Sequence, residues 1–196
     1  MALVVLLRGV NVGGHRTFRP STLAQQLKHL DAVNIGAAGT FVIGKPVSQA
    51  QLRIELARRL PFDTEIIICK GQEIVRLMTR DFFSGYMDCP GIIRFVSVLT
   101  RSPRLSPSIP LSFPPTGEWL VRILARENRF AIGMYRRHMK TISYLGALDR
   151  IFGVPVTTRN WNTITAIAKV LMTARPDSLQ GRTRSRRATG EPAAKQ

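Results

Sequence analysis

The order of apolar periodicities over residues 3–70 constrains the fold of this 196-residue chain more than any other feature. An apolar run at 3–8 predicts a strand, and Pro20 opens a helix in which leucines recur every three or four residues. Two short apolar runs around a turn at Gly39 predict a pair of strands. The pattern up to this point is therefore strand, helix, strand, strand.

A second helix and a fourth strand complete this pattern. Ser48 with Gln51 three residues later forms a capping box, and a leucine at every fourth position up to Leu60 gives the helix one apolar face. The sequence TEIIICK at 64–70 predicts a buried strand. This order is that of a ferredoxin-like α/β plait, in which two helices cover one face of an antiparallel sheet.

The second half of the chain again alternates strands and helices. After a connecting helix, QEIVRLMTRDFF, and a turn-rich boundary, a strand is followed by a proline- and serine-rich loop at 101–117, a hairpin and two helices. We predict an α+β protein of two ferredoxin-like α/β plait units of βαββαβ type, each with an antiparallel sheet and helices on one face. The predicted parts are a first plait at 1–80, a boundary at 81–90, a second α/β unit at 91–174 and a disordered basic tail at 175–196.

The charge of the chain favours anionic partners. Its 29 lysines and arginines face 12 acidic residues, giving a net charge of +17. Residues 174–196 hold six basic and two acidic side chains, which leaves +13 on residues 1–173. A field of this size attracts nucleic acid, anionic lipid or phosphorylated metabolites, although a solvated basic surface is an equally ordinary interpretation.

Cysteine, histidine and hydropathy patterns argue against several classes of protein. Cys69 and Cys89 form no CxxC motif and have no histidine cluster nearby, so we expect reduced thiols and no metal site. The short N-terminal apolar run follows no basic segment, and no stretch approaches the roughly 20 apolar residues that span a bilayer. We therefore predict a cytoplasmic protein without a membrane partner.

The loop after the first strand is the first candidate site. The glycines of RGVNVGG, which include Gly13 and Gly14, can expose converging backbone N–H groups that bind an anion. Arg8 adds a guanidinium group that can bind phosphate or carboxylate through two hydrogen bonds. The motif is neither GxGxxG nor a P-loop. A structural turn that uses glycines at positive φ is the alternative interpretation.

The sequence TTRNWNT at 157–163 is the second candidate. Asn160 is a good N-cap, so helix initiation with Trp161 packed on the core explains the motif without any ligand. Arg159 beside a helix N-terminus, with Trp161 as a stacking surface, would instead make an anion site.

The sequence RFAIGMYRRHMK at 129–140 interleaves rings and cations on a predicted strand. Phe130 and Tyr135 with the basic residues have the composition of a platform for single-stranded nucleic acid, and burial of both rings in the core is the alternative. No catalytic constellation is evident from residue order, so an enzymatic activity and a cofactor stay open.

Together, LLRGVNVGG near the N-terminus and GVPVTTRNWNTIT near the C-terminus resemble the uncharacterised bacterial family catalogued as domain of unknown function 1697. The resemblance covers about residues 2–172 and implies two α/β plaits without an established reaction. It makes Lys140 a further basic motif position. This chain has Ala38, Gly39 and Thr40 where the family has Ser-Gly-Asn, and Ala166 where it commonly has lysine.

These observations lead to one hypothesis about function and two alternatives. We expect both motifs to face an inter-domain cleft that binds a small anionic or nucleotide-like ligand, because function concentrates in loops at the ends of regular elements. Arg8 and Arg159 would hold the negative group, Trp161 would form a wall, and the polar residues Asn11, Thr40 and Asn160 would orient the ligand. The alternatives are a nucleic-acid-binding module and a protein-interaction module that uses residues 101–117.

Overall fold

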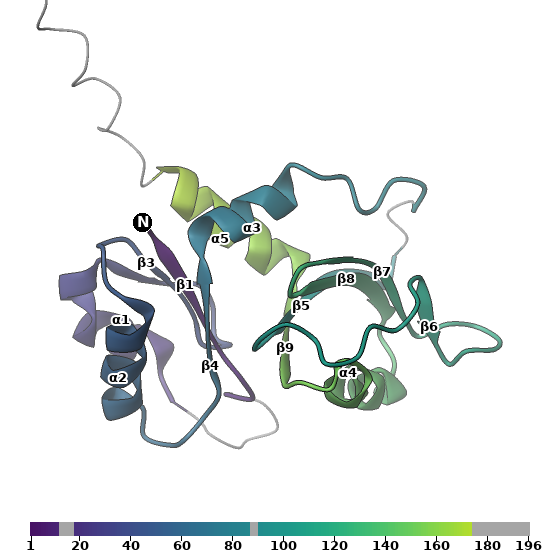
Figure 1. Ribbon diagram of the computed structural model, residues 1–196, viewed down its shortest axis with the longest axis horizontal. Helices are drawn as coiled ribbons and strands as arrows, with labels where there is room; N and C mark the ends of the chain where they lie inside the picture. The colour runs from purple at the N-terminus through teal and green to yellow at the C-terminus, as the bar shows by residue number, and fades with distance from the viewer. Residues whose placement is uncertain (12–17, 87–89, 174–196) are drawn as a thin grey trace, which may run out of the picture.

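The computed structural model describes residues 1–11, 18–86 and 90–173. Gly13, Gly14, Cys89 and the predicted tail lie outside the described residues. Within them the chain forms two antiparallel sheets and five α-helices, which confirms the predicted α+β class. Figure 1 shows the two sheets side by side, with α3 and α5 together at the junction between them.

The first sheet is built from residues 3–70 and has the strand order β2-β3-β1-β4, with every pair antiparallel. Its elements are β1 (Leu3–Leu7), α1 (Pro20–Gln26), the short 3-10 helix η1 (Lys28–Leu30), β2 (Ala32–Asn34), β3 (Thr40–Ile43), α2 (Gln49–Arg59) and β4 (Ile66–Lys70). The predicted capping box starts α2, since the backbone N–H of Gln51 donates to the Ser48 hydroxyl over 3.2 Å.

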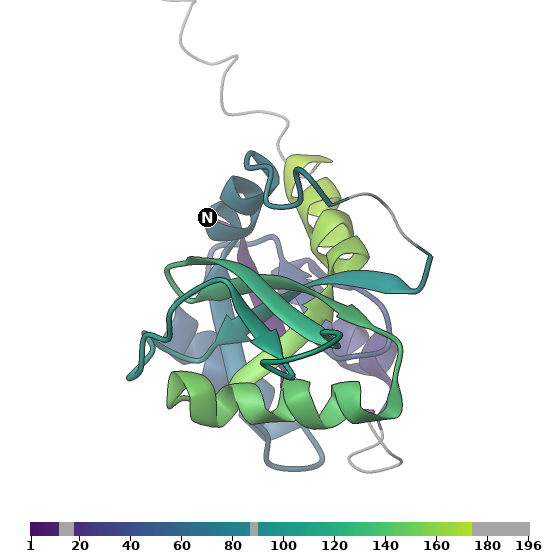
Figure 2. The same cartoon turned by 90° about the vertical axis from the view of Figure 1, so that its right-hand side faces the viewer.

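The second sheet has the order β6-β7-β8-β5-β9 and is also antiparallel throughout. Figure 2 turns this half toward the viewer, with α4 running across one side of the sheet. Its elements are β5 (Ile92–Leu99), β6 (Leu111–Phe113), β7 (Val121–Glu127), β8 (Phe130–Arg136), α4 (Met139–Phe152) and β9 (Val156–Asn160).

The two halves share one strand order. Apart from the edge strand β6, the second sheet runs β7-β8-β5-β9, which repeats the order second, third, first, fourth of the first sheet. The second half departs from the predicted βαββαβ order because residues 101–117 contain β6 and no helix between β5 and β7. The repeated prolines in this segment exclude a regular helix.

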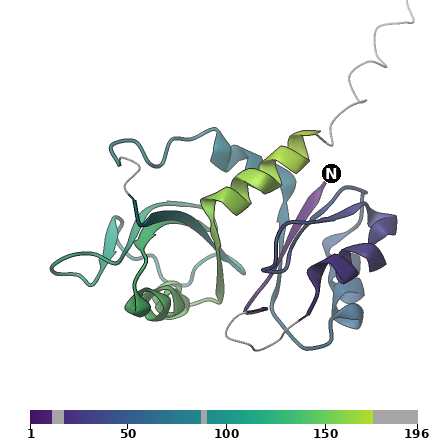
Figure 3. The same ribbon diagram turned by 180° about the vertical axis from the view of Figure 1, so that it is seen from behind.

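The prediction of helices on one face of each sheet holds for α1, α2 and α4, and it omits two helices that cover the other faces. α1 and α2 pack on one face of the first sheet and α4 packs on one face of the second. The other faces meet α3 (Gly71–Met78) and α5 (Trp161–Thr173) in one apolar cluster that contains residues from both sheets. Figure 3 shows α5 from behind, at the junction of the two halves. The predicted limits 1–80 and 91–174 stay predictions, since this cluster joins the halves.

The helix expected at 72–83 is also corrected. α3 ends at Met78, and Phe82 and Phe83 follow in an irregular segment where both rings pack against Trp161. The burial of apolar rings against the shared core therefore prevails over the helical periodicity of this sequence.

Candidate functional site

Arg159 points from β9 into the first half of the molecule and is 7% exposed. Each of its five N–H groups meets a neutral oxygen at hydrogen-bond distance. The acceptors are Thr40 Oγ1 (2.8 Å) for Nε, Thr157 Oγ1 and the Thr158 carbonyl (both 2.9 Å) for Nη1, and the Leu7 and Ala38 carbonyls (both 2.7 Å) for Nη2. Burial lowers the pKa of Arg159 to about 10, so the guanidinium is still charged at neutral pH.

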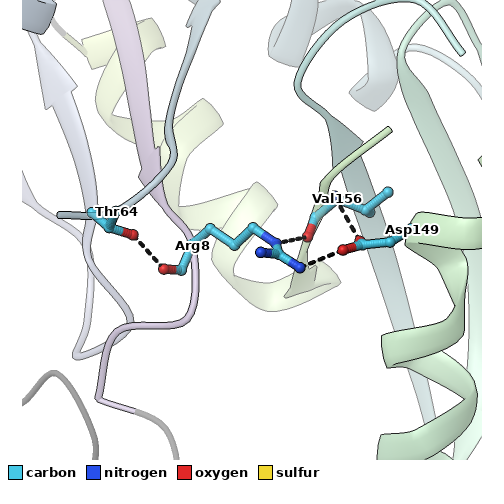
Figure 4. A network of polar contacts seen from close by, with 4 residues as sticks. All are labelled: Arg8, Thr64, Asp149 and Val156. Carbon is cyan, nitrogen blue, oxygen red and sulfur yellow. Dashed lines mark hydrogen bonds and ion pairs between the residues drawn. The ribbon is translucent and has the colours of Figure 1, made fainter. Parts of the chain in front are cut away.

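Arg8 makes the reciprocal connection from the end of β1 (Figure 4). Its Nε donates to the Val156 carbonyl over 3.0 Å, and its Nη2 forms an ion pair with Asp149 of α4. The Asp149 carboxylate also accepts the backbone N–H of Val156 over 2.9 Å, which fixes its position. The side chains of Arg8 and Asp149 are 38% and 31% exposed, so solvent weakens this pair.

Arg129, in the turn just before β8, adds a third link. Its Nη2 donates to the Ile68 carbonyl over 2.6 Å and contacts the Cys69 sulfur at 2.7 Å, both on β4. Burial raises the pKa of the Cys69 thiol to about 11, although Arg129 opposes this effect. We name Arg8, Arg129 and Arg159 the arginine seam, because each joins one half of the molecule to the other.

Asn11 connects the end of the first strand's motif to residues 18 and 37. Its backbone is left-handed, with φ at +54°, and its side chain hydrogen-bonds to Phe18 and Ala37. Oδ1 accepts the Phe18 N–H over 2.9 Å, and Nδ2 donates to the carbonyls of Phe18 (3.1 Å) and Ala37 (2.7 Å). Asn11 and Arg159 thus contact neighbouring residues of the turn before β3, Ala37 and Ala38, while the predicted ligand site stays a prediction.

The remaining candidates have separate positions. Asn160 caps α5, since its Oδ1 accepts the Thr163 N–H over 2.8 Å, which confirms the capping interpretation. Trp161 packs edge-on against Phe83, with ring centroids 4.9 Å apart. Lys140 is exposed at the start of α4, about 13.5 Å along the helix from Asp149, so the structure does not bring it to the seam.

Arg8 and Arg159 both bind groups of the protein itself, whereas the hypothesis of an anion site requires them to bind a ligand. All N–H groups of Arg159 are engaged inside the protein, and the guanidinium of Arg8 is paired with Asp149. A ligand anion would have to displace these partners, at a cost comparable to the hydrogen bonds lost. Both arginines therefore hold the halves together in this structure.

Phe130 and Tyr135 do not share a surface. Phe130 is 2% exposed and belongs to the cluster that joins both sheets, whereas Tyr135 packs on the opposite face against Phe95. Residues at odd spacing on a strand point to opposite sides of the sheet. The two rings therefore form no common platform, and their packing in two apolar clusters agrees with the core interpretation.

Sequence reasoning missed an open cavity of about 540 Å³ beside Trp161, which we name the Trp161 groove. It lies between the segment that follows α3, the strand β5 and the start of α5. Arg94 lies over the Phe83 ring at 4.9 Å, and its Nη2 donates to the Tyr86 carbonyl. The lining residues are Met78, Thr79, Arg80, Asp81, Phe83, Ser84, Arg94 and Trp161. The sequence signal was TRDFFS, in which four charged or polar residues, Thr79, Arg80, Asp81 and Ser84, border two rings.

A second cavity of about 720 Å³ lies between the first sheet and the helices α3 and α5. Its walls are mainly apolar, with Val33, Val75 and Leu171 among them, and none of the candidate residues lines it. The described residues contain no group of three or more histidine, cysteine or acidic side chains that could hold a metal ion. No helix in the described parts of the chain is long and apolar enough to cross a membrane.

Comparison with known proteins yields a fold and no function. No protein-family model matches the sequence, and no curated protein sequence matches it either. The structure of the conserved bacterial protein SP0830 from Streptococcus pneumoniae is similar, with a TM-score of 0.54 and 17% sequence identity. The similarity covers 87% of this chain and 98% of that protein. The resemblance to domain of unknown function 1697 stays a prediction.

Proposed function

We propose that this protein binds a nucleotide-like anion, a flat ring that carries phosphate, in the Trp161 groove. The observation that carries the proposal is the combination, in one open cavity of about 540 Å³, of the Trp161 ring with the guanidinium groups of Arg80 and Arg94. Cavities of about 300–1,000 Å³ are typical of small-molecule sites. Arg8 and Arg159 have no part in this proposal because the arginine seam engages them.

The chemistry of the lining suits such a ligand. Arg80 has a side chain that is 61% exposed, and its ion pair with Glu127 at 2.6 Å leaves it at the rim. Ser84 adds a hydroxyl group that can donate to a phosphate oxygen, whereas the Thr79 hydroxyl donates to the Arg76 carbonyl over 2.9 Å. The negative charge of Asp81 repels an anion. A hydrogen bond from the backbone N–H of Phe83 to Asp81 Oδ1 over 3.1 Å partly offsets this charge.

A fluorescence titration tests the proposal. The chain has two tryptophans, so Trp119→Phe leaves Trp161 as the reporter. Adenosine 5′-monophosphate should quench Trp161, and inorganic phosphate at the same concentration should quench it less, since phosphate lacks the ring. Arg80→Gln should weaken binding of the nucleotide about fivefold, which corresponds to roughly 1 kcal/mol for an exposed charge.

The matched control is Arg58→Gln, which removes the same charge from an exposed position on α2. Arg58→Gln should leave nucleotide affinity unchanged. Absence of quenching at millimolar nucleotide would refute the proposal, and so would equal losses in Arg80→Gln and Arg58→Gln, because they would indicate a nonspecific effect of net charge.

We also propose that the first half is a ferredoxin-like plait and that the chain belongs to the family it resembles. The strand order β2-β3-β1-β4 with α1 and α2 on one face supports the first point. The meeting of the two family motifs at the end of β9 supports the second. A sequence profile built from close relatives tests it, since both motifs should align without gaps.

A further inference from the structure

Arginines continue from the Trp161 groove across one face of the second sheet. Arg94 on β5 and Arg122 on β7 both pair with Met134 on the strand between them, so the two arginines flank it at the same level. Their backbones are about 10 Å apart, since neighbouring strands lie roughly 4.8 Å apart. Arg136 lies two residues beyond Met134 on β8 and therefore points to the same face.

A second tryptophan lies among these arginines. The guanidinium carbons of Arg122 and Arg136 are 5.0 and 4.8 Å from the centroid of the Trp119 ring. Trp119 also packs against the apolar cluster that joins both sheets, to which Trp161 contributes as well. We name Trp119, Arg122 and Arg136 the Trp119 cluster. The face thus carries two tryptophans, each with arginines beside it.

The partners of the Trp119 cluster leave positive charge in excess. Arg122 donates its Nε to the neutral Ser112 hydroxyl over 2.9 Å. Arg136 pairs with Glu118 at 2.8 Å, but the Glu118 side chain is 71% exposed and contributes little. The Nε of Arg136 is buried without a hydrogen-bond partner. Guanidinium groups that gather around rings in this way favour a ligand with several phosphates and flat bases.

We propose that the ligand of the Trp161 groove is a single strand of nucleic acid whose phosphates continue to the Trp119 cluster. This inference rests on the proposed function, since one nucleotide of the strand occupies the groove. Arg94 connects the two parts, because it lines the groove and lies level with Arg122. A free mononucleotide reaches only the groove, so a longer strand gains the contacts to Arg122 and Arg136.

Fluorescence anisotropy with labelled oligodeoxythymidylate of about 12 nucleotides tests the inference on the full chain. The oligonucleotide should bind at least tenfold more tightly than thymidine monophosphate. The logarithm of its affinity should fall with the logarithm of salt concentration with a slope of about −2 for three arginine contacts, from Arg80, Arg122 and Arg136. Arg122→Gln should reduce the magnitude of this slope by about 0.7, and Arg122→Lys should restore it.

Control variants separate this site from the general charge of the chain. Arg58→Gln should leave the slope unchanged, and Arg122→Gln should leave binding of the mononucleotide unchanged. A full-length variant with R182Q, R184Q, R186Q and R187Q should retain the effect of Arg122→Gln, which would exclude the basic C-terminal residues as its cause.

The possible failures are distinct. If mononucleotide binds as tightly as the oligonucleotide and Arg122→Gln has no effect, the inference is wrong and the proposed function stands. If neither ligand binds, the proposed function is wrong as well. If poly-glutamate competes with the oligonucleotide at equal charge, the face recognises an acidic chain without reading bases, which also overturns the inference.

Discussion

Replacing Arg159 with alanine should lower the free energy of unfolding by about 3 kcal/mol. Three of its hydrogen bonds, to Leu7, Thr40 and Thr157, are buried, and each acceptor left without a donor costs about 1–3 kcal/mol. Loss of the buried charge offsets part of this cost. The lowering of the pKa of Arg159 from 12.5 to about 10 corresponds to roughly 3 kcal/mol of unfavourable desolvation.

Urea unfolding measures this loss, with tryptophan fluorescence and far-ultraviolet circular dichroism as two probes that should give coincident transitions. Arg8→Ala is the comparison, because it removes a seam arginine whose side chain is 38% exposed. An exposed ion pair contributes about 0.5 kcal/mol, so Arg8→Ala should lie far closer to the wild type. If Arg159→Ala costs less than about 1 kcal/mol, or no more than Arg8→Ala, the seam is not what holds the halves together.

Two further predictions concern Cys69 and Asn160. Burial raises the pKa of Cys69 from 9.0 to about 11, so the folded state holds the thiol proton more tightly than the unfolded state. The resulting stabilisation is complete below pH 9 and is lost as the pH rises to 11. Between about pH 8 and 10.5, wild-type stability should therefore fall about 2 kcal/mol more than that of Cys69→Ala in urea titrations, and parallel curves would contradict this. Asn160→Ala should cost about 1 kcal/mol and lower the Tm by roughly 3 °C, whereas Asn160→Asp, which retains the capping oxygen, should change it much less.

Local signals predicted the first half of the fold well. The capping box at Ser48 and the leucine spacing placed α2, and Pro20 placed the start of α1. These signals depend on neighbours within a few residues, so the sequence contains them completely. The continuous apolar run of β1 also signals burial on both faces of the sheet. The apolar run does not indicate which helices cover the second face. One of them, α5, lies some 155 residues further along the chain, beyond the reach of any local pattern.

The sequence indicated which segments carry the candidate residues and did not indicate their contacts. Arg159 bonds to the carbonyls of Leu7 and Ala38, but the spacing of Arg159 within TTRN gives no sign that the side chain is buried. Three of its five acceptors are backbone carbonyls, those of Leu7, Ala38 and Thr158, and a carbonyl acceptor does not depend on which side chain stands at its position. The Trp161 groove was missed for a similar reason, since Phe83 was assigned to a helix that ends at Met78.

The acceptors of the arginine seam have a consequence for the evolution of this chain. Arg8 and Arg129 bind the main-chain oxygens of Val156 and Ile68, and Arg159 binds that of Leu7, so any residue at those three positions still supplies an acceptor. At these three contacts, only the arginine is therefore constrained in its side chain, whereas the contacts of Arg8 with Asp149 and of Arg159 with Thr40 constrain both partners. Among relatives with the same fold, the arginines should be invariant while the residues at positions 7, 68 and 156 vary, and methods that detect contacts from correlated substitutions should find no signal for these three contacts.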